Sequence, residues 1–433
     1  MGNKAILYLM LLAIGYVFTL TEPFWGMVTY LSMNYIRPEV LSYNAFRHWR
    51  LPENTMIFIM IVCYLRAKYS RLLSILFTPT IFFLLIMTFF MWLSGFNALR
   101  PDISLKWTGE AFKMIIVTIF FILLTDTPKK LNYLLITHLA GGGFLALWAF
   151  QQHFLGNLRL ERVGGGTTDT SNDIAALFVL IFPLFLYLLS HKNKIIKFGS
   201  MLGSLFVLAD IIFTQSRSAF VGLIMILPYI LIRYKSRKKY ILALIAIPIM
   251  FYAATTTSLN EQSYVDRIDN MMVHGMDVDQ SAATRKVLWS VAWKIFKANP
   301  WLGVGQQNYQ YNQGSYGGSQ RPRDAHNSYM LILSEGGFLT TFCYLVTQLL
   351  FFLQMFQLRR FAIKNNNLSL QNLVTALESG MIAFLVCGLA HSYIVFEYYY
   401  YWLGFPLILK NVNTQPAIES LPVNEQLNGL QVD

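Results

Sequence analysis

The sequence predicts an all-α polytopic membrane protein of about twelve transmembrane helices, with one large extracytoplasmic loop that contains helices. Of its 433 residues, 55% are hydrophobic and only 13% are charged, and the mean hydropathy is +0.46. These values lie outside those of soluble globular proteins of this size. Long apolar runs recur along almost the whole chain, for example at 173–190. We therefore expect one helical bundle rather than several domains.

Apolar runs mark the expected crossings of the membrane. We place them near residues 4–20, 54–66, 75–95, 110–125, 131–152, 173–190, 197–213, 218–233, 239–256, 327–357, 374–392 and 395–410. The segment 24–36 is short for a span and is interfacial, re-entrant or a further crossing. If it does not cross, both termini are cytoplasmic. If it crosses, the amino terminus moves outside and nothing downstream changes.

Basic connectors predict the orientation of the bundle. Five of them fall on one side of the expected topology: 66–71, 128–130, 191–197, 233–239 and 359–364. The positive-inside rule places such connectors in the cytoplasm, so the other connectors are extracytoplasmic. The expected division of the chain is transmembrane helices over 1–256, a large periplasmic loop over 257–326, C-terminal transmembrane helices over 327–410 and a cytoplasmic, disordered tail over 411–433.

Charge and cysteine content exclude several classes of protein. The formal net charge is +12, but the lysines and arginines are scattered over short connectors and form no face for a nucleic acid. The three cysteines, Cys63, Cys343 and Cys387, lie within apolar runs, which favours buried side chains over a disulfide or a metal site. The first apolar run lacks an A-x-A cleavage site, so we interpret it as a membrane helix rather than a removed signal peptide.

The large external loop contains a predicted amphipathic helix. In TRKVLWSVAWKIFKANP, apolar residues recur at helical spacing, and Asn299-Pro300 ends the pattern. Trp289 and Trp293 are four residues apart, which is typical of a helix at the membrane interface. The next segment, 301–320, is rich in Gly, Gln, Asn and Tyr. It is either a surface that binds sugars or lipid headgroups or a simple flexible connector.

Two polar positions lie at the predicted external edge of the membrane. Arg217 is in a short turn between two crossings, where a permanent charge is costly unless it is paired or faces water. It is either a snorkelling arginine or an anion clamp, because a guanidinium matches phosphate oxygens bidentately. His326 and Asn327 stand where the external loop re-enters the membrane. Position alone favours a helix cap or a packing residue there.

Neighbouring charges favour a functional site around His326. Arg321, Arg323 and Asp324 are close to it in sequence, and Arg285 lies on the same side of the membrane. Several arginines around one histidine depress its pKa and favour the neutral form. A neutral histidine can act as a general base near neutral pH.

One more polar group, Glu335, lies about two helical turns into a long apolar run and is followed by Gly336-Gly337. It either pairs with an arginine and supports the structure or acts directly. Metal-binding patterns of the H-E-x-x-H or zinc type are missing from the sequence. Asp277 and Asp279 form a D-x-D pair, but only within the long external loop. We therefore expect chemistry without a metal or a cofactor.

Three motifs together resemble the O-antigen ligase/polymerase superfamily: TQSRSAFVGL (214–223), NPWLGVGQQNY (299–309) and AHNSYMLILSEGGFLTTFCYL (325–345). The shared pattern is a Ser-Arg turn, a G-x-G after a proline, and a His-Asn that begins a helix containing Glu-x-Gly. SNDIA (171–175) resembles the start of another helix of the family. The stretch 24–43 is similar to the amino-terminal part of its ligases, including O-glycosylation ligases.

This resemblance implies a glycosyltransferase of the bacterial inner membrane whose active site faces the periplasm. Such an enzyme transfers a glycan from undecaprenyl diphosphate to a hydroxyl-bearing acceptor such as the lipid A core, so these molecules and membrane lipids are the expected partners. His326 is then expected to take the proton of the acceptor hydroxyl, while Arg217 and Arg285 stabilise the diphosphate. In-line attack predicts inversion of the anomeric configuration.

Further substrate contacts are expected from Arg321, Arg323, Asn327, Arg162, Asn172 and Glu335. The acceptor stays open among lipid A core, another lipid-linked repeat unit, as in a polymerase, and a serine or threonine of a protein. A small-anion transporter is an alternative of a different class. It predicts paired discontinuous helices and an internal repeat, whereas the long loop and His326 occur once in the sequence.

Overall fold

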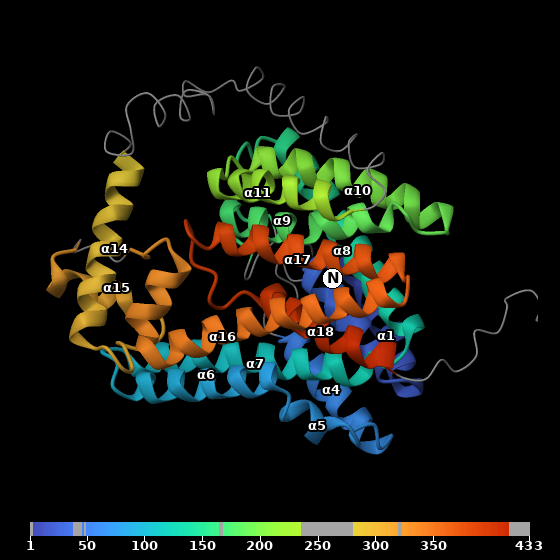
Figure 1. Ribbon diagram of the computed structural model, residues 1–433, viewed down its shortest axis with the longest axis horizontal. Helices are drawn as coiled ribbons and strands as arrows, with labels where there is room; N and C mark the ends of the chain where they lie inside the picture. Colours follow the sequence, from blue (N-terminus) through green and yellow to red (C-terminus); the bar gives the residue numbers. More distant parts are fainter. Residues whose placement is uncertain are drawn as a thin grey trace, which may run out of the picture.

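The chain is an all-α polytopic membrane protein, and most of its long helices run along the longest axis of the molecule (Figure 1). The computed structural model describes residues 3–37, 46, 49–163, 168–234, 280–318 and 323–414. The predicted crossing at 239–256, the first part of the predicted periplasmic loop and most of the predicted tail lie outside these residues.

The first ten described helices are α1 (Asn3–Thr21), α2 (Phe24–Ile36), α4 (Leu51–Leu65), α5 (Leu72–Leu76), α6 (Pro79–Phe96), α7 (Pro101–Leu124), α8 (Pro128–Phe154), α9 (Ser171–Leu188), α10 (Lys194–Phe213) and α11 (Arg217–Arg233). The later ones are α14 (Gln280–Ala298), α15 (Tyr309–Asn312), the 3-10 helix η1 (Gln313–Tyr316), α16 (Ser328–Lys364), α17 (Leu368–Cys387) and α18 (Glu397–Thr414).

Seven of the described helices are long and apolar enough to cross a membrane: α6, α7, α8, α9, α10, α16 and α17. Shorter apolar helices lie at Ile6–Thr21 and Leu51–Leu65. Helices α11 and α18 coincide with predicted crossings but are not among the seven. The helical, multi-span class is therefore confirmed, while the total of about twelve crossings stays a prediction.

Local sequence explains where many of these helices begin. Pro79, Pro101 and Pro128 each open a helix, where the missing N–H costs nothing and the fixed φ suits the first turn. Thr170 and Asp173 form a capping box at the start of α9, with the Thr170 side chain accepting from the Asp173 N–H and the Asp173 carboxylate accepting from the Thr170 N–H. The boundaries of the helices therefore follow short-range signals.

Helices α9 and α17 form the centre of the bundle. Of the apolar window in each, 83% is buried, against 44% in α6, α10 and α16. Glycines bring the helices close: a Cβ at Gly380 in α17 would lie 2.2 Å from the Leu180 carbonyl oxygen in α9, and one at Gly222 in α11 would lie 2.9 Å from the Ala383 carbonyl oxygen in α17. Such small-residue contacts are how membrane helices pack tightly.

One end of the bundle, here called the loop end, carries α14, α15 and η1, which lie on the left in Figure 1. Helix α7 starts there, because the Arg100 N–H donates to Asn308 Oδ1 over 2.8 Å. It runs to the opposite end, here called the basic end. There the Lys130 ammonium lies 3.1 Å from Glu22 and 2.9 Å from Asp126, and Lys68 lies 3.8 Å from Glu22. The same end of the bundle thus carries residues 66–71 and 128–130, which are predicted to lie on one side of the membrane.

Helix α2 returns along α1 inside the bundle. A Cβ at Gly15 would lie 2.4 Å from the Thr29 side chain, and one at Gly26 would lie 2.8 Å from the Thr19 side chain, which is the pairing of antiparallel helices. Most of α2 is buried, and Arg37 at its end lies 2.5 Å from Glu397 at the start of α18. The segment 24–36 is therefore an integral helix of the bundle, and α1 starts at the loop end.

The interpretation of 359–364 as a basic loop is wrong. Helix α16 continues through Lys364, and only residues 365–367 connect it to α17. Arg359 is buried in the bundle, where its guanidinium pairs with the Glu378 carboxylate and donates to Thr375 Oγ1 over 3.0 Å. These partners let a charged side chain remain inside the helix packing.

Candidate functional site

The G-x-G segment and the Glu-Gly-Gly segment pack backbone against backbone. Gly337 interrupts α16 with φ 63° and ψ −166°, a conformation essentially confined to glycine. The N–H groups of Val304 and Gly305 donate to the carbonyls of Ser334 and Glu335, over 3.1 and 2.8 Å. Beyond the break, the Phe338 N–H donates to the Pro300 carbonyl over 2.7 Å. The loop thus occupies the hydrogen-bonding positions that the break leaves open.

Glu335 supports this junction from inside. Its side chain is 2% exposed, and Oε1 accepts from the Tyr309 N–H over 3.1 Å. Its carbonyl also accepts from Ser94 Oγ over 2.8 Å. Within the described part of the chain, backbone N–H groups rather than an arginine donate to the Glu335 carboxylate, so the carboxylate stabilises the start of α15. A contact of Glu335 with substrate stays a prediction.

Helix α14 packs the predicted apolar face inward, with Leu288, Val291, Ala292 and Ile295 buried. Trp289 Nε1 donates to the Ala325 carbonyl over 3.1 Å, and the Tyr309 hydroxyl donates to the Leu288 carbonyl over 2.9 Å. The Trp289 indole thus holds the segment just before His326, and the position of α14 at the membrane interface stays a prediction. Trp293 remains 46% exposed. Arg285 lies half-buried one turn before Trp289.

His326 is half-buried at the loop end, with its backbone in the left-handed region at φ 49°. Burial is the largest cause that lowers the pKa of His326 below its usual 6.5. Asp324 raises this pKa, while His391, Arg285 and Arg323 lower it further. The direction agrees with the prediction from sequence. The main cause differs, because desolvation outweighs the arginines.

Asn327 is the N-cap of α16. Its Oδ1 accepts from the N–H groups of Tyr329 and Met330, over 2.9 and 3.0 Å, and its Nδ2 donates to the Leu389 carbonyl over 3.0 Å. The side chain is thus engaged with the protein on both sides, as expected for a cap that satisfies free N–H groups. This arrangement directs the chain into the bundle immediately after His326.

The connector between α17 and α18 contributes His391, which the sequence reading missed. His391 Nε2 lies 3.2 Å from Asp173 Oδ1 at the start of α9, and its ring centroid lies 5.7 Å from that of His326. Ser328 Oγ fixes the backbone by donating to the His391 carbonyl over 2.9 Å. The predicted crossing at 374–392 ends earlier, since α17 stops at Cys387. The polar break HSY between two apolar runs is the signal that could have revealed His391.

Asn172 contacts the same connector between α17 and α18. The buried Tyr393 hydroxyl donates to the Asn172 carbonyl over 2.9 Å. Burial raises the pKa of Tyr393 well above its usual range, so the hydroxyl stays a donor. The contact uses the backbone of Asn172, and a role for its side chain in substrate binding stays a prediction.

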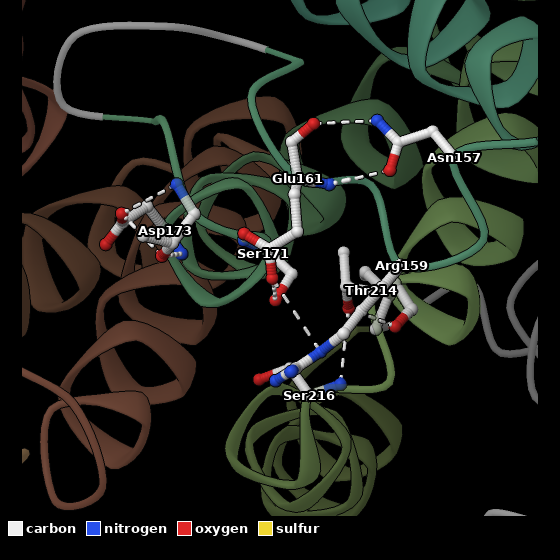
Figure 2. A network of polar contacts seen from close by, with 9 residues as sticks. Asn157, Arg159, Glu161, Ser171, Asp173, Thr214 and Ser216 are labelled. Carbon is white, nitrogen blue, oxygen red and sulfur yellow. Dashed lines mark hydrogen bonds and ion pairs between the residues drawn. The ribbon is translucent and has the colours of Figure 1, made fainter.

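Arg162 lies on the connector between α8 and α9, with an exposed side chain and φ 58°. Its neighbour Glu161 organises the connector: its backbone forms two hydrogen bonds with the Asn157 side chain, and its carboxylate accepts from Ser171 Oγ over 3.0 Å and lies 3.8 Å from the Arg159 Nε. Figure 2 shows this network together with the turn that precedes α11. The network holds the connector against the start of α9.

The remaining predicted cations are placed as follows. Arg217 is the first residue of α11 and is half-buried. Its neighbour Ser218 forms a side-chain hydrogen bond with Cys387, so Arg217 lies at the end of the bundle where α17 stops. Arg323 is exposed, and its carbonyl accepts from Gln313 Nε2 over 3.3 Å. Arg321 lies outside the described residues.

A cavity of about 690 Å³ extends from His391 to the side of the bundle. Its inner wall includes Asp173, Asp324 and His391. Its other wall is formed by α2, α4 and α7, where Ile57 and Met60 are 55% and 42% exposed. The cavity therefore connects the region around His391 with an apolar outer surface of the bundle.

A family model described as O-antigen ligase matches residues 202–345. This part of the chain belongs to the O-antigen ligase superfamily. The match supports glycan processing of the ligase or polymerase type, and it includes Arg217, Arg285 and His326. No curated protein matches the chain significantly.

Part of the candidate site lies outside the residues that match the O-antigen ligase model. Asp173 and His391, and the cavity walls from α2, α4 and α7, lie before or after residues 202–345. Within the described part of the chain, no three His, Cys, Asp or Glu side chains gather in a group that could hold a metal ion. The candidate site is thus formed partly by the matched region and partly by residues before and after it.

Proposed function

We propose that the chain transfers a glycan from undecaprenyl diphosphate to a hydroxyl-bearing acceptor, at the loop end of the bundle and on the periplasmic face of the inner membrane. The observation that carries this proposal is the position of His326 within the O-antigen ligase match. It is half-buried, its pKa is lowered, and Arg285 and Arg323 are close enough to affect it.

In this reaction His326 accepts the proton of the acceptor hydroxyl. The acceptor oxygen attacks the anomeric carbon, the bond from that carbon to the diphosphate oxygen breaks, and its electron pair stays on the diphosphate. A lowered pKa keeps the imidazole neutral and able to accept a proton near pH 7. In-line displacement inverts the anomeric configuration.

The leaving diphosphate needs positive charge at fixed positions, because negative charge develops on its oxygens. Arg285 lies on α14 close enough to lower the pKa of His326, and Arg217 begins α11 at the same end of the bundle. Guanidinium groups bind phosphate oxygens through paired N–H donors. We assign Arg217 and Arg285 to the diphosphate, with Arg323 and Arg321 as further contacts.

The proposed function is tested by transfer in liposomes. The purified chain is reconstituted with a radiolabelled undecaprenyl diphosphate glycan, and three acceptors are supplied separately: lipid A core, a second lipid-linked glycan and a serine-containing peptide. We expect consumption of the donor with an equal amount of glycosylated product from one of them. NMR of the new linkage is expected to show inversion. Unchanged donor with all three acceptors would reject the proposal.

The same assay tests the expectation of chemistry without a metal. Transfer is measured with EDTA and again after a divalent ion is restored. We expect equal rates in both. Loss of transfer with EDTA and recovery with the ion would show that a metal takes part.

A further inference from the structure

Carboxylates dominate the wall of the 690 Å³ cavity. Six line it: Glu53, Glu110, Asp173, Asp324, Glu335 and Glu397. The arginine and lysine in the lining are already paired. Arg37 lies 2.5 Å from Glu397, and the Lys113 ammonium lies 2.9 Å from Glu110 and 3.5 Å from Glu53. The described lining therefore has a negative formal charge, although the whole chain carries +12.

Several buried polar atoms in the same lining have no hydrogen-bond partner among the described residues. One is Nε2 of Gln306, a donor on a side chain that is only 1% exposed. Two others are Nδ1 of His391 and Oγ of Ser392. In the neutral form of His391, the Nε2 atom that faces the Asp173 carboxylate carries the proton, which leaves Nδ1 as an acceptor. Unpaired buried polar atoms are rare, and here a donor and an acceptor share one cavity.

The cavity also has the size and surfaces of a small-molecule site. Its volume lies within the range of roughly 300–1,000 Å³ that is usual for ligand pockets. Trp107 and Tyr30 add aromatic surface to the lining. A sugar suits this combination, since its hydroxyl groups both donate and accept hydrogen bonds and its ring has an apolar face.

The arginines that act on His326 lie outside the cavity lining. Asp324 acts on His326 and also lines the cavity. Arg285 and Arg323 act on His326 without lining the cavity, whereas carboxylates outnumber the cations in its wall. A diphosphate is attracted by the former and repelled by the latter. The donor diphosphate therefore belongs on the arginine side, and the cavity is left for the other substrate.

We propose that this cavity binds the acceptor, and that the acceptor is a saccharide whose bound part carries hydroxyl or amino groups and no phosphate or carboxylate. Gln306 Nε2 donates to a sugar oxygen, and His391 Nδ1 accepts from a sugar hydroxyl. The carboxylates accept from further hydroxyl groups. This inference rests on the proposed transfer reaction and specifies its acceptor.

Matched acceptors test the inference. The reconstituted chain receives the labelled undecaprenyl diphosphate glycan and one of two oligosaccharides that differ only in a single phosphate on the terminal sugar. We expect kcat/KM for the unphosphorylated acceptor to be higher by about tenfold or more. Equal use of the two, or preference for the phosphorylated one, would overturn the inference. Transfer to a serine peptide but to neither oligosaccharide would also overturn it.

Variants that neutralise two carboxylates test whether the cavity causes the preference for the unphosphorylated acceptor. The double variant Glu53→Gln with Glu110→Gln keeps the shape of both side chains and is expected to reduce the preference at least threefold. Asp102→Asn is the matched control, because Asp102 is an exposed carboxylate at the loop end that does not line the cavity. It should leave the preference unchanged. A preference that survives in the double variant contradicts the inference.

Gln306→Met removes the donor while keeping a similar length. We expect it to raise KM for the unphosphorylated acceptor about tenfold and to leave KM for the lipid donor unchanged. An increase in the donor KM alone would place the donor in the cavity instead. If the wild-type chain transfers glycan to no acceptor, the proposed function fails together with this inference. If transfer occurs without these preferences, only the inference fails.

Discussion

The backbone of His326 lies at φ 49°, a region that residues other than glycine adopt mainly when they are Asn, Asp or His. The neighbours hold it there: the Ala325 carbonyl accepts from Trp289, and Asn327 caps α16. Holding a residue in such a conformation costs on the order of 1 kcal/mol. Residues on both sides of His326 therefore hold a strained backbone in place. Strained residues that are held in this way are common at functional sites.

The environment of His326 predicts an acid limb in the pH–rate profile. A base must be neutral, so the rate rises as the pH increases through its pKa and is constant above it. Since the pKa of His326 is lowered from 6.5, half of the maximal rate is expected below pH 6.5. Asp324 raises this pKa, so Asp324→Asn should move the acid limb to still lower pH. The measurement is kcat for glycan transfer between pH 4.5 and 8.

The direction in which the acid limb moves in Asp324→Asn tests whether His326 causes that limb. A limb that moves to higher pH in Asp324→Asn would contradict the assignment of the limb to His326. Glu161→Gln serves as a control, because this carboxylate belongs to the connector network and does not affect the pKa of His326. Its acid limb should coincide with that of the wild type.

Arg285 is expected to act on the leaving diphosphate. Removal of one group that stabilises developing negative charge reduces kcat by about 100-fold or more. Arg285→Gln should show such a loss in single-turnover transfer. Lys286→Gln removes the same charge from the next residue of α14, which is exposed, and should retain most of the activity. Equal losses in the two variants would point to net charge on α14 rather than to Arg285.

At the scale of elements, the break in α16 depends on glycine. A Cβ at Gly337 would lie 2.5 Å from the Trp301 carbonyl carbon, and φ there is 63°. We expect Gly337→Ala to lower the free energy of unfolding by about 2–4 kcal/mol. Gly109→Ala is the matched control, since no atom lies within 4 Å of its added Cβ and helix α7 favours alanine. Thermal unfolding in detergent compares the two, and an equally stable Gly337→Ala would contradict this account.

Helices with long apolar runs could be predicted from sequence, because each is determined by its own composition. The sequence shows Gly336-Gly337 beside Glu335, but it does not show that the backbone of residues 300–305 packs into a break at Gly337. That pairing joins segments about thirty residues apart in the chain, and no local pattern encodes it. His391 was missed for a related reason: it lies between two apolar runs, and only the contact with Asp173 in α9 marks it.

Arg359 shows that a basic stretch does not by itself identify a cytoplasmic loop. Its position in a basic stretch indicated a cytoplasmic loop, yet it is buried against Glu378 from the next helix. A charge pattern describes one segment at a time, whereas the cost of burying a charge depends on a partner from elsewhere. The same limit applies to the cavity, whose wall combines residues from α2, α4, α7, α9 and the 388–396 connector.

For the whole molecule, the two ends of the bundle predict a labelling pattern. The three native cysteines are buried, so single cysteines can be introduced at exposed positions of each end. Leu158→Cys lies on the connector at the loop end, and Lys192→Cys lies on a connector at the opposite end. A membrane-impermeant maleimide should label position 158 in right-side-out vesicles and position 192 in inside-out vesicles. The reverse pattern would place the site in the cytoplasm.

Transfer by His326→Asn tests the central claim most directly. Asparagine tolerates the left-handed backbone at this position, so the variant removes the base with little change in the chain path. In liposomes with undecaprenyl diphosphate glycan and acceptor, we expect transfer to fall by about 100-fold or more, with donor binding and melting temperature unchanged. Transfer at the wild-type rate by folded His326→Asn would contradict the role assigned to this histidine and the site built around it.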